Sequence, residues 1–139
     1  MSIQFSTAVR NAKNDAMETA IGTTPILRLY NGTPPATVAT ALSGNTLLAE
    51  GTLPSDWLTA SSSGAKSKNG TWTLTGQSGA GAGTASTFFR IYAVDGTTPH
   101  TQGTATASGG GGDMTLDNNS IANAQTVTVN SFTMTEGGA

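Results

Sequence analysis

The chain has 139 residues, a length that suits one domain, and it contains no cysteine, which excludes disulfides, thiolate nucleophiles and cysteine-based zinc sites. Charged residues make up only 10% of the chain, against about 25% in an average domain, and the net charge is −2. This balance gives no electrostatic footprint for nucleic acid or an anionic membrane. A surface of small polar residues loses little on desolvation, so the composition favours broad contact with another protein.

One helix is predicted near the start of the chain, over about residues 6–21, where apolar side chains recur at steps of three and four residues. Ser6 or Thr7 can cap its first turn. Gly22 stands where a glycine commonly ends a helix, and Pro25 prevents the helix from restarting.

The apolar face of this helix is narrow and is expected to dock on a flat surface, either the protein's own sheet or a neighbouring subunit. Phe5 and Val9 supply its few large side chains, whereas Asp15 and Glu18 are expected on the solvent side. Ile21 belongs to the same apolar pattern at the end of the helix, and the remaining members are alanines, which bury little area each: Ala8, Ala12, Ala16 and Ala20.

After Pro25 the pattern changes to the period of two that is typical of strands. The predicted strands cover residues 26–30, 46–53, 71–75, 87–94, 101–107, 114–116 and 125–135. Asp95-Gly96 is a hairpin signal, Pro99 restricts the following strand to an edge, and a phase slip near Asn130-Ser131 indicates a β-bulge. Short strands with closely spaced turns are typical of an antiparallel sandwich or barrel.

We expect a single domain over residues 1–139, mainly β, built as an antiparallel β-sandwich over about residues 26–135 with one N-terminal α-helix. Side chains of shared parity predict its core: Leu27, Leu29, Trp72, Leu74, Phe89, Ile91, Val127, Val129 and Phe132.

The search for catalytic or metal-binding residues predicts none. His100 is the only histidine and has no second ligand nearby in the sequence, while a metal site needs three or four. Glu50 and Asp56 flank a Leu-Pro corner, but a strand residue facing solvent and a turn cap explain them better than a hydrolytic carboxylate pair. We therefore expect a protein that is not an enzyme and has no cofactor.

Trp57 differs from the other aromatic residues because it lies in a loop that begins with a proline. It is expected either to plug one end of the sandwich or to anchor a partner. The candidate partner-contact residues are therefore Phe5, Val9 and Trp57. The sequence shows no signal peptide and no apolar run of about 20 residues, so we expect a soluble protein that is made in a cytoplasm.

Five groups of residues resemble small structural proteins of tailed bacteriophages, most closely the head cement, or decoration, proteins of short-tailed phages. They are residues 5–12 (FSTAVRNA), 21–22 with 27–30 (IG, LRLY), 48–50 with 53–57 (LAE, LPSDW), 70–72 with 89–92 (GTW, FRIY), and 114–118 with 125–129 (MTLDN, QTVTV). The resemblance implies a jelly-roll-like fold and a place on the outer surface of an HK97-type capsid. It also implies two partners, the major capsid protein and a second copy in a homodimer, and no catalytic residues.

The alternative is a tail or fibre module that binds host-surface carbohydrate, as small β-domains often do. Such a module needs exposed aromatic side chains as a sugar platform, and Trp57 is the only candidate.

Overall fold

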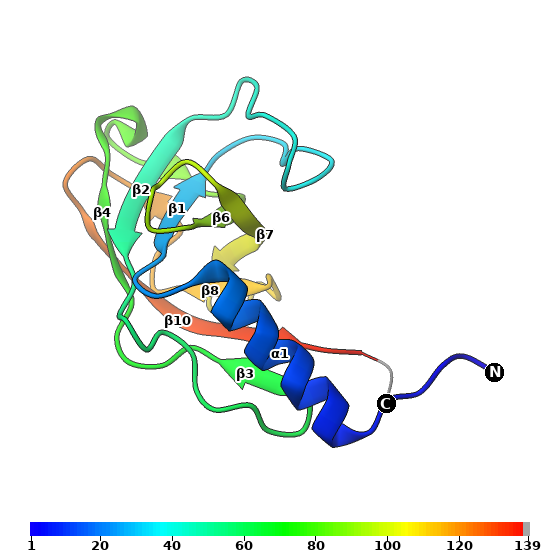
Figure 1. The fold of residues 1–139 in the computed structure, drawn as a ribbon. Coiled ribbons are helices and arrows are strands. Elements are labelled where there is room, and N and C mark those ends of the chain that lie inside the picture. The colour runs from blue at the N-terminus through cyan, green and yellow to red at the C-terminus, as the bar shows by residue number, and fades with distance from the viewer. Residues whose placement is uncertain (138–139) are drawn as a thin grey trace.

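The chain folds as one helix followed by short strands, and the computed structural model describes residues 1–137 (Figure 1). Helix α1 spans Thr7–Ile21, as predicted. The Ser6 hydroxyl caps it by accepting a hydrogen bond from the backbone N–H of Val9 at 3.3 Å. Gly22, with φ of 90°, ends it by donating to the carbonyl of Glu18 at 2.9 Å, a backbone conformation that favours glycine.

The strands follow the predicted order, with ends moved by a few residues. Three short strands, β3, β5 and β9, were not predicted, because two or three residues show no usable alternation. The described elements are β1 (Ile26–Tyr30), β2 (Leu47–Thr52), β3 (Ala65–Ser67), β4 (Thr73–Gly76), the 3-10 helix η1 (Ser78–Ala80), β5 (Thr84–Ala85), β6 (Phe88–Tyr92), β7 (Pro99–Ala107), β8 (Met114–Leu116), β9 (Ser120–Ile121) and β10 (Thr126–Thr135).

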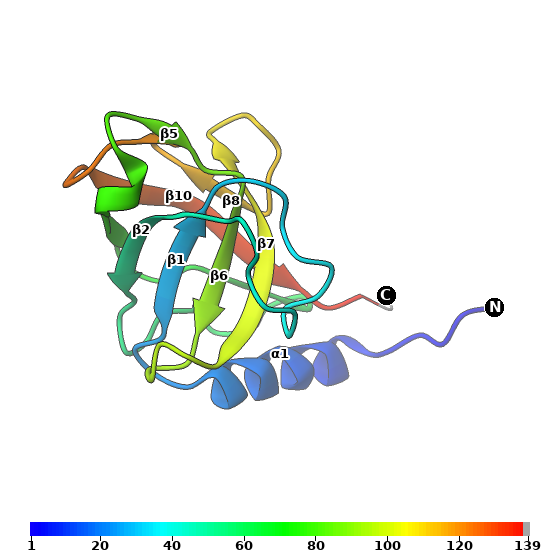
Figure 2. The same ribbon diagram turned by 90° about the horizontal axis from the view of Figure 1, so that it is seen from above.

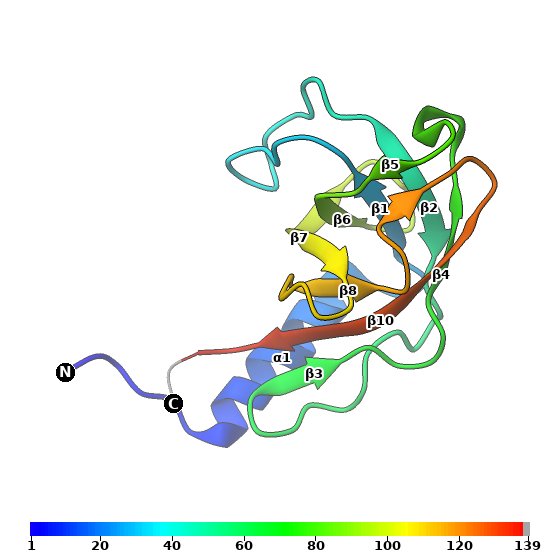
Figure 3. The same cartoon turned by 180° about the vertical axis from the view of Figure 1, so that it is seen from behind.

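Seven strands form one closed ring in the order β10-β4-β2-β1-β6-β7-β8 and back to β10. The prediction of a mainly β fold with one helix is confirmed. The predicted sandwich of two facing sheets is not confirmed, because the strands enclose a barrel. The short strand β8 makes the closure, since it pairs with β7 on one side and with β10 on the other (Figure 3). The β7–β8 pairing is parallel, so the expectation of a wholly antiparallel sheet is wrong there.

All nine predicted core residues are buried inside this ring, and Phe132, at 4% exposed, is the most accessible of them. The aromatic rings pack on one another, with Trp72 lying 5.3 Å from Phe132 between centroids and Phe89 lying 5.7 Å from Phe132. Strand β6 is buried on both faces, because Phe88 and Tyr92 form a second apolar cluster outside the ring with Tyr30.

Two predicted irregularities lie where the sequence places them. The register of β10 against β8 shifts between Val129 and Ser131, which confirms the bulge. Pro99 begins β7, whose pairing with β8 covers only residues 105–107. The proline therefore lies in the part of β7 that has β6 alone as its neighbour, although β7 as a whole is an interior strand of the ring.

Candidate functional site

The exposed apolar side chains of the protein gather at the N-terminal end. Of five large hydrophobic residues that are exposed, four lie within residues 1–9: Met1, Ile3, Phe5 and Val9. Phe5 is 39% and Val9 44% exposed, so both predicted contact residues are accessible. The Phe5 ring has one close charged neighbour, Lys13, whose ammonium nitrogen lies 4.6 Å from the ring centroid.

Helix α1 is fastened to the barrel by polar side chains. The side-chain carbonyl of Asn11 accepts a hydrogen bond from the backbone N–H of Gly64 at 2.8 Å. Asp15 accepts from the Ser61 hydroxyl at 2.6 Å, and Lys13 pairs with Glu136 beyond the end of β10. The helix thus lies along one end of the ring, held by the segment before β3 and by the residue after β10 (Figure 2).

Of the two surfaces expected for the alanine-rich face of the helix, the protein's own sheet is excluded, while contact with a neighbouring subunit stays a prediction. The four alanines are all exposed, and the side of the helix that faces the barrel carries Asn14, Met17 and Ile21. An alanine methyl buries too little area to compete with an ion pair and with larger apolar side chains for the docking position. The face defined by Phe5, Ala8, Val9, Ala12 and Ala16, here called the N-terminal face, therefore points into solvent.

Asp15 and Glu18 were expected on the solvent side, but both bind one buried cation. Lys66 of β3 is 5% exposed, and its ammonium donates to Asp15 at 2.8 Å and contacts Glu18 at 2.5 Å. Burial alone would lower the pKa of Lys66, but the hydrogen bonds that its ammonium donates to these carboxylates raise the pKa above its usual value. Hydrogen bonds from Lys66 and Ser61 lower the pKa of Asp15.

Trp57 does not belong to an exposed contact surface. It is fully buried, its ring lies 5.9 Å from that of Trp72, and its indole N–H donates to the carbonyl of Gly22 at 3.1 Å. The residue is a plug beneath the C-terminal end of α1, so the partner-anchor expectation is corrected. Seven of the eight aromatic residues of the chain are buried, and Phe5 is the exception.

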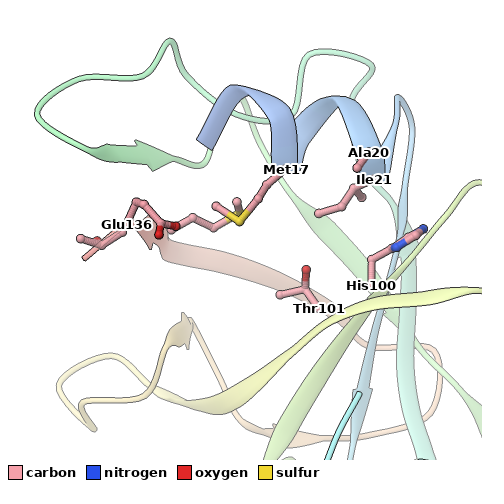
Figure 4. A pocket seen from close by; sticks show the side chains of 8 residues that line it. Met17, Ala20, Ile21, His100, Thr101 and Glu136 are labelled. Carbon is pink, nitrogen blue, oxygen red and sulfur yellow. The ribbon is translucent and has the colours of Figure 1, made fainter. Parts of the chain in front are cut away.

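A groove of about 360 Å³ lies between α1 and the open part of the ring. The groove is lined by three residues of α1, two of β7 and three at or just beyond the end of β10: Met17, Ala20, Ile21, His100, Thr101, Met134, Thr135 and Glu136 (Figure 4). Sequence analysis missed it because these residues come from three separate segments. The one available signal was the i, i+4 pair Met17 and Ile21 on a helix face otherwise built of polar residues.

The carboxylates that the sequence search considered have structural partners. Glu50 pairs with Arg28 at 2.5 Å, and Asp56 accepts from the Asn69 amide at 2.9 Å. Within residues 1–137 no group of three or more His, Cys, Asp or Glu side chains is placed to hold a metal ion. That the protein is not an enzyme stays a prediction.

No helix in the described part of the chain is both long enough and apolar enough to cross a membrane. The sequence matches no family model, and no curated protein or solved structure shows significant similarity to it.

Proposed function

We propose that this chain is a non-enzymatic capsid cement protein that binds the outside of an HK97-type phage head and stabilises the shell. One observation carries the proposal: α1 is fastened to the barrel by polar side chains, with Met17 and Ile21 on the same side, and turns its alanine-rich side outward. The N-terminal face is exposed and does not pack on the barrel, and contact with a partner surface would remove it from water.

The chemistry of this face suits a broad, flat contact. Alanine side chains let a helix approach a surface closely, and Val9 and Phe5 add larger apolar contacts at one end. Burial of such a surface costs little, because few hydrated charges must lose their water; Asp15 is the exposed carboxylate beside it and is already bound to Lys66. Many weak copies of one contact, repeated over a shell, add up to strong reinforcement.

The carbohydrate-binding alternative receives no such support. Its single candidate residue, Trp57, is buried, and Phe5 is the only exposed aromatic residue among those described. Sugar platforms depend on exposed aromatic rings, and the buried Trp57 cannot supply one. Of the two phage roles considered, the capsid role is therefore better supported than the fibre role. The proposal keeps the jelly-roll-like description of the strands and the outer capsid location that the resemblance implies.

The first test measures copy number in purified virions by quantitative gel staining. A cement protein is expected near the number of major capsid subunits, whereas a fibre module is present in few copies. A copy number far below that of the capsid subunits would overturn the proposal.

The second test maps the contact on expanded shells that lack the protein. The variant Ala12→Glu/Ala16→Glu places two charges on the N-terminal face and is expected to weaken shell binding at least tenfold. The matched control is Ala36→Glu/Ala39→Glu, two exposed alanines of the loop between β1 and β2, which is expected to bind normally. Normal binding by the first variant, with loss in the control, would place the interface elsewhere.

A further inference from the structure

The wall of the barrel is split below β8. Strand β7 pairs with β6 over residues 99–104, and β8 covers only its last residues, 105–107. Strand β10 pairs with β8 over Val129–Phe132 and beyond that with β3 alone, over Thr133–Thr135. Among the described strands, none lies between residues 99–104 and residues 133–135, so both segments have one open edge.

The backbone groups on these two edges point toward the split. The N–H of Thr104 faces away from β6 and donates to the Asp113 carboxylate at 2.8 Å, and the alternation of an antiparallel strand turns the N–H of Gln102 the same way. On β10, the carbonyl of Phe132 accepts from Lys68 on the β3 side. By the same alternation, the backbone groups of Thr133 and Thr135 face the split. An extended segment placed there could therefore pair with both strands.

The groove described above lies at this split, with α1 along its rim (Figure 4). Met17, Ile21 and Met134 give it an apolar lining, and its volume of about 360 Å³ falls in the range of sites that accept small ligands or a few side chains. Apart from the N–H of Thr104, which Asp113 binds, the split thus offers two things together, strand edges without a pairing strand and an apolar recess. This combination is typical of sites that bind an added β-strand.

Residues 1–6 have the pattern that such a site requires. Met1, Ile3 and Phe5 alternate with Ser2, Gln4 and Ser6, so an extended arm carries one apolar and one polar face, with no charged side chain. In the structure the arm is extended and free of secondary structure, and Met1 and Ile3 are 120% and 79% exposed. Exposed apolar residues that alternate in this way can form one face of a β-strand when a pairing strand is available.

In the structure the arm does not enter the groove of its own chain. It leaves Ser6 in the direction away from the barrel (Figures 1 and 2). Met17 lies eleven residues along α1 from Ser6, which is about 16 Å at the helical rise per residue. Ile3, three residues on the other side of Ser6, reaches back at most about 10 Å even when the chain is fully extended.

We propose that the N-terminal arm of a second copy of this chain enters the groove as an added strand. Its apolar residues Met1 and Ile3 lie against Met17, Ile21 and Met134, and its backbone pairs with the open edge of β7. A two-fold arrangement satisfies both chains at once, since each gives an arm and receives one. The proposal adds a site and an occupant to the expected homodimer, and it does not depend on binding to a capsid.

The absence of cysteine allows a direct test with engineered thiols in the full-length protein. Ile3→Cys protein is mixed with Thr101→Cys protein under mild oxidation, and the expected product is a disulfide-linked pair of the two variants. The matched control replaces Thr101→Cys by Ala39→Cys, in the exposed loop between β1 and β2, and is expected to cross-link at least tenfold more slowly. Equal rates would overturn the proposal.

A second measurement does not depend on cross-linking. Sedimentation equilibrium is expected to give a dimer for the full chain and a monomer for the chain without residues 1–5. Because Met1 and Ile3 are exposed, the deletion is expected to leave the midpoint of thermal unfolding unchanged under dilute conditions, which separates loss of the arm from loss of the fold. A monomeric full chain, a deletion that stays dimeric, or a disulfide within a single Ile3→Cys/Thr101→Cys chain would each contradict the proposal.

Discussion

Lys66 of β3 and Asp15 of α1 are joined by a hydrogen-bonded ion pair of 2.8 Å that fastens the helix to the barrel. The same ammonium contacts Glu18 one turn further along the helix. Lys66→Met keeps the apolar stem and removes the charge, which leaves both carboxylates without their cation. We expect the free energy of unfolding to fall by about 1–3 kcal/mol, as measured by urea denaturation.

The control for this prediction is Lys68→Met, because Lys68 donates to the carbonyl of Gly70 at the surface. We expect it to change stability by less than about 0.5 kcal/mol. Amide hydrogen exchange of α1 should accelerate in the Lys66 variant alone. Equal behaviour of the two variants would show that the ion pair does not hold the helix.

Asp95 gives a prediction about pH. Its carboxylate accepts hydrogen bonds from the backbone N–H groups of Thr98 and Thr97 and from the Thr98 hydroxyl, and these bonds lower its pKa below the usual 3.8. A lowered pKa in the folded state stabilises the protein above pH 3.8, and this contribution is lost as the pH falls through the folded-state pKa. Asp95→Asn should therefore be less stable than the parent at pH 7.

Thermal unfolding from pH 7 to pH 2 checks the sign, because the difference between Asp95→Asn and the parent should shrink at the acid end. Thr98→Val removes one hydroxyl donor, keeps the backbone donors and should show an intermediate effect. A difference that grows toward pH 2 would contradict the assignment.

Asn14 is fully buried beneath α1, and neither atom of its amide has a hydrogen-bonding partner in the protein. A buried amide without partners costs about 1–3 kcal/mol. Asn14→Leu, which keeps the number and branching of the side-chain heavy atoms, is therefore expected to raise the free energy of unfolding by about 1 kcal/mol. The contrasting variant is Asn11→Leu, which removes the bond to Gly64 and is expected to lower stability. Destabilisation by both variants would mean that the Asn14 amide is bound.

Gly76 tests how closely the barrel packs at the end of β4. A Cβ atom added there would lie 1.9 Å from the backbone carbonyl oxygen of Ala122, which cannot move freely. Gly76→Ala is expected to lower the free energy of unfolding by about 1–3 kcal/mol. At Gly137 an added Cβ meets no atom within 4 Å, so Gly137→Ala serves as the neutral control in the same urea series.

Much of the fold was predictable because local rules set it. The capping side chain of Ser6 and the conformational freedom of Gly22 mark both ends of α1, and these signals act within one turn. Leu27 and Leu29 share a parity that only one face of a strand can satisfy, and both are buried in the ring. Elements of this kind can be predicted from a few adjacent residues.

The remaining features depend on distant partners. Lys66 and Asp15 are 51 residues apart, and the sequence around either residue does not predict this ion pair, which helps to decide which side of the helix faces the barrel. Ala12 belongs to the apolar pattern of the helix, but its methyl group buries too little area to determine which side of the helix faces the barrel. Ring closure is set by the three residues of β8, whose two pairings join separate parts of the chain. The groove and the exposed N-terminal face follow from these contacts, which is why the sequence did not predict them.

Three pairings of β10, with β3, β4 and β8, also set a constraint on biosynthesis. Until the ribosome has released residues 126–135, β4 and β8 each lack a neighbour and the apolar interior stays open along one side. At ordinary rates of translation, the strands that are synthesised first wait on the order of ten seconds before β10 can pair with them. Bare strand edges attract other chains, and a nascent polypeptide with so few charges repels them weakly. The interval before β10 emerges is therefore when a molecular chaperone matters most to this protein.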